Sequence, residues 1–307
     1  MSSLPNLLAL MINRISGLIG DERIRLLEKF DNADDFSVLS KKDIEGIIGR
    51  VLGARSWNGD QIRALAENDA ALALKKGIRW VSWKDGAYPP LLREIYDPPV
   101  MLFYRGSLPN PEKPLAAVVG TRKPSPQLRD RAFVLGRDLG EAGIPVVSGL
   151  ALGIDSMAHL GNIIAGAPTI AVMGTGVDEV YPPSNRDLAR RILETGGLLL
   201  SEYPPGTGPK KWQFPARNRI ISALARGTVI VEAPEKSGAL ITARFALEQG
   251  RDIWVDMLGV SSNRGGGTAR LVEDGAKIVR SARDILTEWN IPISSCELTC
   301  EEPSSWR

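Results

Sequence analysis

Six short apolar runs, each followed by a glycine-containing loop and an amphipathic stretch, recur between Leu115 and Leu286. The runs occupy residues 116–119, 144–147, 169–173, 197–200, 228–231 and 253–255. Continuous apolar character is typical of strands buried on both faces, and amphipathic stretches between such strands are typical of crossover helices. We therefore expect an α/β domain with a doubly wound, mainly parallel sheet that is covered by helices on both faces.

The first 76 residues have a different pattern, in which apolar residues recur at spacings of three and four without strand-like alternation. This pattern predicts a small all-α domain over residues 1–76. Asp21 is expected to cap a second helix over residues 22–30, and the SGLIG segment at 16–20 is interpreted as the preceding turn. A nucleic-acid-binding helix-hairpin-helix is the alternative to a plain helical-bundle turn at that segment.

Residues 77–106 contain short apolar pieces broken by Pro and Gly, which predict short strands and a turn. We expect these strands to connect the helical domain to the main domain, which then spans residues 77–288. The remaining residues, 289–307, form a polar tail that is predicted to be flexible. The tail contains Cys296 and Cys300, interpreted as free thiols, with a redox pair as the alternative.

The composition limits the classes of function. The formal net charge is only +2, so a basic footprint for nucleic acid must be local. No apolar run approaches the roughly 20 residues that span a bilayer, and no secretory signal is apparent, so we expect a cytoplasmic protein without membrane contact. His159 is the only histidine, and neither a metal-ligand set nor a nucleophile with its base is apparent. We expect no catalytic residues, no metal and no cofactor.

The loops that follow the strands are the candidate binding residues, because ligands of open parallel sheets bind outside the carboxyl ends of the strands. The first loop has a glycine for close backbone approach at Gly120, and Arg122 supplies a bidentate phosphate donor. Ser125 and Pro126 predict a capped helix start with free amides facing the ligand. The spacing matches neither the dinucleotide fingerprint nor a Walker A loop. A capped helix with a solvated arginine is the alternative.

The second and third loops are rich in glycine, with the sequences SGLALGID at 148–155 and GTGVD at 174–178. Asp155 is expected to cap the following helix, and His159 within that helix is expected to be packed or at the surface rather than to act as a base. The candidates for ligand contact in these loops are Ser148, Gly149, Gly153 and Gly174.

The fourth loop contains the most informative pattern, KKWQFPARNR at 210–219. Basic residues alternate with aromatic residues, and single-stranded nucleic acid requires both, because phosphates need cations and unstacked bases need a ring. Stacking contributes about 1–3 kcal/mol per base, so Trp212 or Phe214 should matter as much as one arginine. Alternatively, the rings are core residues and the charges belong to a solvated loop.

The fifth loop offers Lys236 and the backbone amides near Ser237 and Gly238 as a further phosphate cradle. Glu232, at the start of this loop, is expected to orient Arg217 or Arg219 rather than to perform catalysis. The GGGT segment at 265–268 follows the sixth strand. Either its backbone approaches the ligand closely or the segment is a mobile turn.

In this order the motifs resemble the DprA/Smf family of DNA-processing proteins. They are GTR at 120–122, SGLALGID at 148–155, GTGVDEVYPPSN at 174–185, SEYPPGT at 201–207, FPARNRIIS at 214–222, VEAPEKSGALITA at 231–243 and DGA at 274–276. The combination of FPARNR and KSGALITA in one chain is highly specific, and the resemblance is strong over about residues 80–283.

The resemblance implies an extended Rossmann domain with a small SAM-like helical domain before it. It further implies a homodimer that binds single-stranded DNA in a basic pocket and loads a RecA-type recombinase in natural transformation, without enzymatic activity. The pocket residues that it implies are Gly120, Arg122, Lys211, Phe214, Arg217, Asn218 and Arg219, and Thr121 of the GTR motif is a further candidate binding residue.

The sequence departs from the family pattern at several places. Thr121 replaces the commoner Ser, VDMLG at 255–259 stands where the family usually has Val-Pro-Gly, and Ala269 stands where Asn is common. These differences concern the rim of the pocket near the sixth strand. We also expect no C-terminal winged-helix domain, which many members have.

Two other functions remain open. A nucleotide-binding sensor or nucleotide-cleaving enzyme of a related Rossmann fold is the main alternative to a single-strand binder. The aromatic and basic stretch at 210–219 discriminates between them, because a mononucleotide pocket does not need it. The third possibility is a scaffold protein with a relict pocket.

Overall fold

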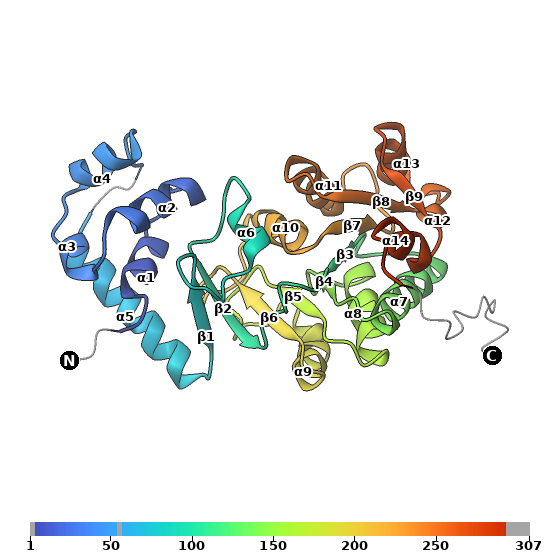
Figure 1. The fold of residues 1–307 in the computed structure, drawn as a ribbon, viewed down its shortest axis with the longest axis horizontal. Helices are drawn as coiled ribbons and strands as arrows, with labels where there is room; N and C mark the ends of the chain where they lie inside the picture. The colour runs from blue at the N-terminus through green and yellow to red at the C-terminus, as the bar shows by residue number, and fades with distance from the viewer. Residues whose placement is uncertain (1–3, 54–56, 293–307) are drawn as a thin grey trace.

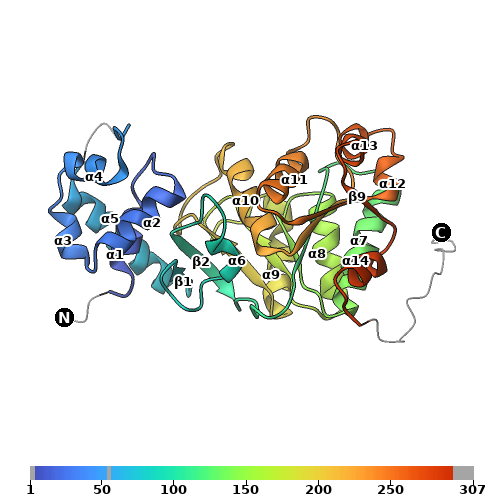
Figure 2. The ribbon, with the colours of Figure 1, turned by 45° about the horizontal axis from the view of Figure 1, so that its top comes forward.

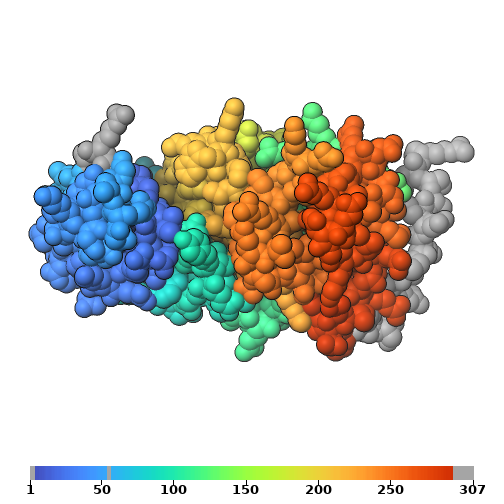
Figure 3. All heavy atoms as spheres, turned by 90° about the horizontal axis from the view of Figure 1, so that it is seen from above, coloured from blue at the N-terminus to red at the C-terminus, as the bar shows by residue number. Residues whose placement is uncertain are grey.

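A computed structural model describes residues 4–53 and 57–292 of the chain. Helices precede and surround one nine-stranded sheet, and the helical N-terminal part lies at one end of an elongated molecule (Figure 1, Figure 3). The helices are α1 (Leu7–Asn13), α2 (Gly20–Lys29), α3 (Ala33–Ser37), α4 (Lys41–Ile48), α5 (Gly59–Lys75), α6 (Pro90–Arg93), α7 (Pro126–Glu141), α8 (Ile154–Ile164), α9 (Arg186–Glu194), α10 (Gln213–Leu224), α11 (Gly238–Glu248), α12 (Met257–Val260), α13 (Gly266–Glu273) and α14 (Ala282–Glu288), with a short 3-10 helix η1 at Pro183–Asn185.

The sheet has the strand order β1-β2-β6-β5-β4-β3-β7-β8-β9. Its strands are β1 (Arg79–Ser82), β2 (Met101–Gly106), β3 (Ala116–Val119), β4 (Val146–Ser148), β5 (Ile170–Val172), β6 (Leu198–Ser201), β7 (Gly227–Ile230), β8 (Asp252–Asp256) and β9 (Lys277–Val279). The β1–β2 and β2–β6 pairs are antiparallel and all other pairs are parallel. The predicted doubly wound, mainly parallel α/β fold is confirmed.

The two faces of the sheet are covered by different helices. One face of β3 packs against α7 and α8, and its other face packs against α10 and α11 (Figure 1, Figure 2). The six predicted strands are present, and their first residues differ from the predicted ones by at most two positions. The sequence did not predict β9, because this edge strand has only three residues and two of them are exposed.

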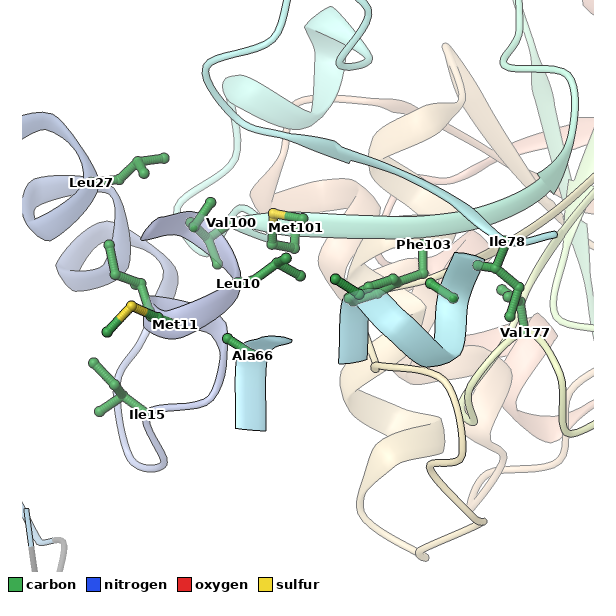
Figure 4. Packing of buried hydrophobic residues seen from close by; sticks show 14 of the residues in the cluster. Leu10, Met11, Ile15, Leu27, Ala66, Ile78, Val100, Met101, Phe103 and Val177 are labelled. Atoms are coloured by element: carbon green, nitrogen blue, oxygen red, sulfur yellow. The ribbon is translucent and has the colours of Figure 1, made fainter. Parts of the chain in front are cut away.

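The N-terminal helices share an apolar cluster with the sheet. Leu10 and Met11 of α1 pack in the same cluster as Met101 and Phe103 of β2 (Figure 4). Val177, which follows β5, also belongs to it. The helical part therefore packs against the antiparallel end of the sheet by burial of apolar side chains.

The expected role of Asp21 as a helix cap is wrong, because α2 already begins at Gly20. The amide of Ile19 donates to the Glu22 carboxylate at 3.0 Å, and the amide of Gly20 donates to the Asp97 carboxylate. These acceptors satisfy amides at the helix start without Asp21. Asp21 is instead exposed and forms an ion pair with Arg25 at 3.0 Å.

The chain beyond α14 is packed for longer than expected. Trp289 is only 4% exposed, its ring centre lies 5.5 Å from that of Trp254, and its indole nitrogen donates to Asp252. The predicted start of the flexible tail, residue 289, therefore lies too early in the sequence, because Trp289 is packed against the domain. Cys296 and Cys300 lie outside the described residues. Within the described ranges no helix is long and apolar enough to cross a membrane.

Candidate anion-binding site

A cavity of about 750 Å³ lies at the carboxyl end of the sheet, next to β3. After β3 the chain continues to β4 on one side, whereas after the neighbouring β7 it continues to β8 on the other side, so the loops that follow these two strands separate. The cavity is lined by Val119, Gly120, Thr121, Arg122, Lys123, Ala151, Asp155, Tyr181, Lys211, Phe214, Pro215, Arg217, Asn218, Ile221, Pro234, Lys236, Ser237, Gly238, Ala239, Thr242 and Arg264. Ten of the predicted site residues therefore come together in one place.

The loop between β3 and α7 forms one wall of the cavity. A Cβ atom on Gly120 would lie 2.6 Å from the Ile154 side chain, so only glycine fits there without displacement. Ser125 caps α7, since its side chain accepts a hydrogen bond from the amide of Leu128, and Pro126 is the first helical residue. The predicted capped helix start is confirmed, and the exposed Arg122 precedes it.

Arg217 of α10 lies at the floor of the cavity and is only 4% exposed. Its Nη1 atom donates to the carbonyl oxygens of Gly149, at 2.7 Å, and Val172. Its Nε atom is buried and has no partner in the described part of the chain. Burial lowers the pKa of Arg217 to about 10, although the nearby Asp155 carboxylate raises it. The guanidinium therefore remains a cation at neutral pH.

Asp155 supports this floor, but the expectation that it caps α8 is wrong. Gly153, with φ of 80°, precedes the first helical residue, and Asp155 is the second residue of the helix. Its carboxylate accepts hydrogen bonds from the amides of Gly149, at 3.1 Å, and Ala151. Burial raises the pKa of Asp155, while Arg217 and these amides lower it. The carboxylate thus holds the loop before the helix close to Arg217.

Phe214 supplies the aromatic wall. Its ring centre lies 5.2 Å from that of Tyr181, and the Arg122 guanidinium lies 6.0 Å from the ring centre. A Cβ atom on Gly174 would lie 2.8 Å from the ring, so Gly174 provides the space for it. Trp212 lies outside the lining, is 60% exposed and has its ring centre 5.8 Å from that of Tyr203. The two aromatic residues of the predicted motif therefore occupy different places.

The start of α11 forms the opposite wall. Ser237 caps this helix by accepting a hydrogen bond from the amide of Ala239 at 3.2 Å. The side-chain amide of Asn218 donates to the carbonyl oxygen of Gly238 at 3.1 Å and so joins α10 to α11. Lys236 is exposed at the rim. The amides at the helix start add partial positive charge to this wall.

Positive charge at the cavity is only partly compensated. Six lining residues are cationic, Asp155 is the single acidic one, and the whole chain has a net charge of only +2. Across residues 4–53 and 57–292, no ion pair involves any of these six cations. They are Arg122, Lys123, Lys211, Arg217, Lys236 and Arg264. Such a cluster attracts anions.

Three predicted site residues support the cavity from behind rather than line it. The Ser148 hydroxyl is buried and donates to the carbonyl oxygen of Val118 at 2.7 Å. The carbonyl of Gly149 accepts from Arg217, as described above. A Cβ atom on Gly153 would lie 2.5 Å from the carbonyl oxygen of Thr121, so this glycine permits the two loops to meet. Their contribution is to backbone geometry.

Arg219 lies on the other side of α10, and its assignment to the pocket is corrected. Its guanidinium forms ion pairs with Glu202 at 2.7 Å and with Asp97 at 2.9 Å, and its side chain is 7% exposed. Burial lowers the pKa of Arg219, but the two carboxylates raise it above its ordinary value. The residue therefore joins α10 to β6 and to the segment before β2 instead of facing the cavity.

The expected role of Glu232 is also wrong. Its carboxylate accepts a hydrogen bond from the Ser262 hydroxyl at 2.5 Å, and within the described residues it forms no hydrogen bond or ion pair with Arg217 or Arg219. His159 is buried, with Nδ1 2.7 Å from the Thr169 hydroxyl, as expected for a packed histidine. Burial lowers the pKa of His159 to about 3, so the ring is neutral.

Two cavity cations were not predicted as site residues, Lys123 and Arg264. Lys123 was within the first loop but was not singled out from Arg122. Arg264 lies directly before the GGGT segment, and the prediction for this loop concerned only its glycines. A cation in a loop after a parallel strand was the available signal for both.

The fold and the cavity define an α/β protein with a cationic cavity at the switch point of a mainly parallel sheet. The model of the family described as DNA recombination-mediator protein A matches residues 79–290. The chain belongs to this family, the DprA/Smf family that its motifs resemble.

Curated relatives match most of the chain. It is 39% identical over 276 residues to the DNA processing protein DprA of Streptococcus pneumoniae, a match that covers 89% of this chain and 95% of the relative. It is 41% identical over 215 residues to the DNA processing protein DprA of Bacillus subtilis, covering 70% of this chain and 72% of the relative.

Solved structures agree with this placement. The X-ray structure of DNA processing protein A from Streptococcus pneumoniae has a TM-score of 0.75 at 37% identity and covers 92% of this chain and 97% of that one. DNA processing protein A from Helicobacter pylori has a TM-score of 0.60 at 30% identity and covers 69% of this chain and 96% of that one. The latter structure was described for that protein's single-stranded DNA binding mode.

Proposed function

We propose that the cavity binds the phosphates and bases of single-stranded DNA. The observation that carries this proposal is the cluster of six cations that form no ion pair within the described residues and that share the cavity with the Phe214 and Tyr181 rings. Phosphates require the cations, and unstacked bases require a ring face. The single-stranded DNA binding mode described for the Helicobacter pylori relative supports the same ligand.

Within this proposal the predicted residues have separate tasks. Arg122, Lys211 and Lys236 reach the cavity from three different loops and would bind phosphate oxygens. Arg217 and the helix starts would supply fixed positive charge behind them. Phe214 would stack on a base. We assign no chemical step to the site, and the protein acts by binding.

We further propose that the protein works in the cytoplasm as a homodimer that loads a RecA-type recombinase onto the bound strand during natural transformation. The family description as a recombination mediator supports the loading role. Because a mediator must present the strand to a second protein, the open carboxyl end of the sheet is the appropriate place to hold it.

A mononucleotide is the competing ligand, because a volume of about 750 Å³ is within the range of small-molecule sites. Fluorescence anisotropy with labelled oligo-dT, matched duplex DNA, ATP and GMP over a range of salt concentrations separates the two. For a single strand the slope of log affinity against log salt should approach about −0.7 per phosphate contacted. Tight binding of ATP or GMP with little salt dependence, and none of oligo-dT, would overturn the proposal.

A further inference from the structure

The loop between β8 and α13 folds back over the carboxyl end of the sheet and reaches the cavity. It contains α12, and Arg264 at its far end lines the cavity. The Nη1 atom of Arg264 donates to the carbonyl oxygen of Lys123 at 3.1 Å, so the loop contacts the loop after β3. Arg264 is exposed and has no ion-pair partner in the parts of the chain that the structure describes.

This loop is held in place by several close contacts. The Thr268 hydroxyl oxygen lies 2.7 Å from the carbonyl oxygens of both Gly259 and Gly265, and the amide of Gly267 donates to the carbonyl oxygen of Ala233 at 2.9 Å. A Cβ atom on Gly259 would lie 1.7 Å from a carbonyl oxygen of the strand-end segment after β7. The loop is therefore fixed before any ligand binds, which reduces the entropy lost on binding.

Glu232 connects this loop to the loop that carries Arg122. Its carboxylate Oε1 accepts from the Ser262 hydroxyl at 2.5 Å, while its backbone carbonyl accepts from the Thr121 amide at 2.8 Å. Its Oε2 atom is buried without a partner among the described residues. One buried residue thus sets the separation of two loops that each present an arginine at the same cavity.

The chemistry at Arg264 suits a phosphodiester. One N–H group of its guanidinium is used by Lys123, and a guanidinium has five, so a bidentate pair of donors remains for phosphate oxygens. Lys123 and Arg264 both line the cavity, and Asp155 is the only acid among its described lining residues. An anion bound by both would relieve their repulsion.

We infer that Arg264 is a further phosphate-binding residue, which extends the strand-binding site from Arg122 across the end of β3 toward β8. Ser262 and Glu232 are its positioning residues. The inference rests on the proposed function, because it assigns the path of the single strand through the same site. The loop that departs from the family pattern at 255–259 would thereby add a contact of its own to the rim.

The test uses the full chain and labelled oligo-dT. Arg264→Gln should weaken binding about threefold to tenfold and reduce the magnitude of the log–log salt slope by about 0.7, the value of one phosphate contact. Arg270→Gln is the matched control, because Arg270 is an exposed arginine of the neighbouring α13 that does not line the cavity. Thermal unfolding of each variant should match that of the wild type.

Positioning by Ser262 is tested with a double-mutant cycle. Ser262→Ala should weaken oligo-dT binding, but the Ser262→Ala/Arg264→Gln variant should bind no more weakly than Arg264→Gln alone, since Ser262 acts through Arg264. If the loss of binding free energy in the double variant equals the sum of the losses in the two single variants, the positioning role of Ser262 is overturned. A purely structural effect of Ser262 would not depend on residue 264.

The outcomes separate the inference from the proposed function. If Arg264→Gln keeps wild-type affinity and salt slope while Arg122→Ala weakens binding, the inference is overturned and the proposed function stands. If the wild type fails to bind oligo-dT, both are overturned. Loss of affinity in Arg270→Gln equal to that in Arg264→Gln would also overturn the inference, because the effect would then be one of general charge.

Discussion

Helix α10 presents two arginines of the same motif to two different surroundings. Arg219 faces the end of β6 and the segment before β2, where Glu202 and Asp97 neutralise it. Arg217 faces the cavity, where within the described residues its hydrogen bonds go to carbonyl oxygens and Asp155 is the one acid among six lining cations. The two arginines are only two residues apart in sequence. Arg219 is matched, in that carboxylates pair with it, whereas Arg217 belongs to an unmatched cluster, in which cations outnumber carboxylates.

The comparison shows that the presence of carboxylate partners distinguishes a cation with a structural role from a cation that is available to bind a ligand. The positive charge alone does not distinguish them. A buried cation with its carboxylates in place has no need of an external anion. A group of cations that outnumbers its carboxylates, as the six lining cations outnumber Asp155, is held in repulsion, which an external anion relieves. The number of basic residues in a motif does not reveal which case applies.

The largest expected effect is on folding, at the matched arginine. Arg219→Met leaves the Glu202 carboxylate buried without its cation, and removal of one partner of a buried pair costs about 3–5 kcal/mol of unfolding free energy. Urea unfolding measures this loss. Arg190→Met is the control, because Arg190 and its two ion-pair partners, Asp187 and Glu194, are mostly exposed and the cost should be below about 1 kcal/mol. Equal losses of unfolding free energy in Arg219→Met and Arg190→Met would mean that the buried ion pairs of Arg219 stabilise the fold no more than exposed ones do.

The next effect is on binding, at an unmatched arginine. Arg122→Ala should cost about 1.5–3 kcal/mol of binding free energy for all strand sequences, the value of a charged hydrogen bond. It should also reduce the salt slope by about 0.7. Anisotropy titration with oligo-dT checks both, and unfolding free energy should stay within about 0.5 kcal/mol of the wild type. Unchanged affinity would place the end of β3 outside the site.

A similar or smaller loss is expected for the aromatic wall. Phe214→Leu keeps an apolar side chain against Gly174 but removes the stacking face, at a cost of about 1–2 kcal/mol of binding free energy. The salt slope should not change, because no charge is removed. Phe245→Leu, a partly buried aromatic of α11 outside the cavity lining, is the control. A reduced salt slope in Phe214→Leu would mean that the ring acts by orienting Arg122.

The smallest effect concerns another matched pair, Lys76 of the helical part and Asp178 after β5, at 2.5 Å. Burial raises the pKa of Asp178, but Lys76 and the Gly206 amide lower it below its ordinary value of 3.8. The stabilisation is therefore present above pH 3.8 and is lost as the pH falls through the lower folded-state pKa. Asp178→Asn should cost about 1 kcal/mol at neutral pH.

Urea unfolding of the wild type and of Asp178→Asn from neutral pH to about pH 3 measures this dependence. The difference between them should shrink toward acid pH. A difference that grows toward acid pH would mean that the carboxylate is destabilising in the folded protein and that the pair is not matched.

The sequence predicted the sheet and most of the cavity because both depend on local patterns. Buried strands read as apolar runs, and Gly120 with Ser125 and Pro126 reads as a strand end followed by a helix start. The order of the parallel strands then places such loops at one end of the sheet. These steps require no knowledge of side-chain partners.

The errors concern partners that are distant in sequence. Helical geometry alone places Arg217 and Arg219 on different sides of α10, but it does not say which side faces the cavity. Glu202 and Asp97 decide that, and Asp97 lies 122 residues away. Glu232 was misassigned for the same reason, since its partner Ser262 belongs to a loop whose fold had no local signature.

The cations of the cavity are contributed by separate loops, after β3, β6, β7 and β8, together with α10. In an unfolded chain these loops are far apart, and no anion site exists. Any anion that binds the cavity therefore binds the native state alone and raises the apparent stability by mass action. Inorganic sulfate or phosphate should raise the melting temperature of the protein without DNA. The measured stability of the fold then depends on the anion concentration of the solution.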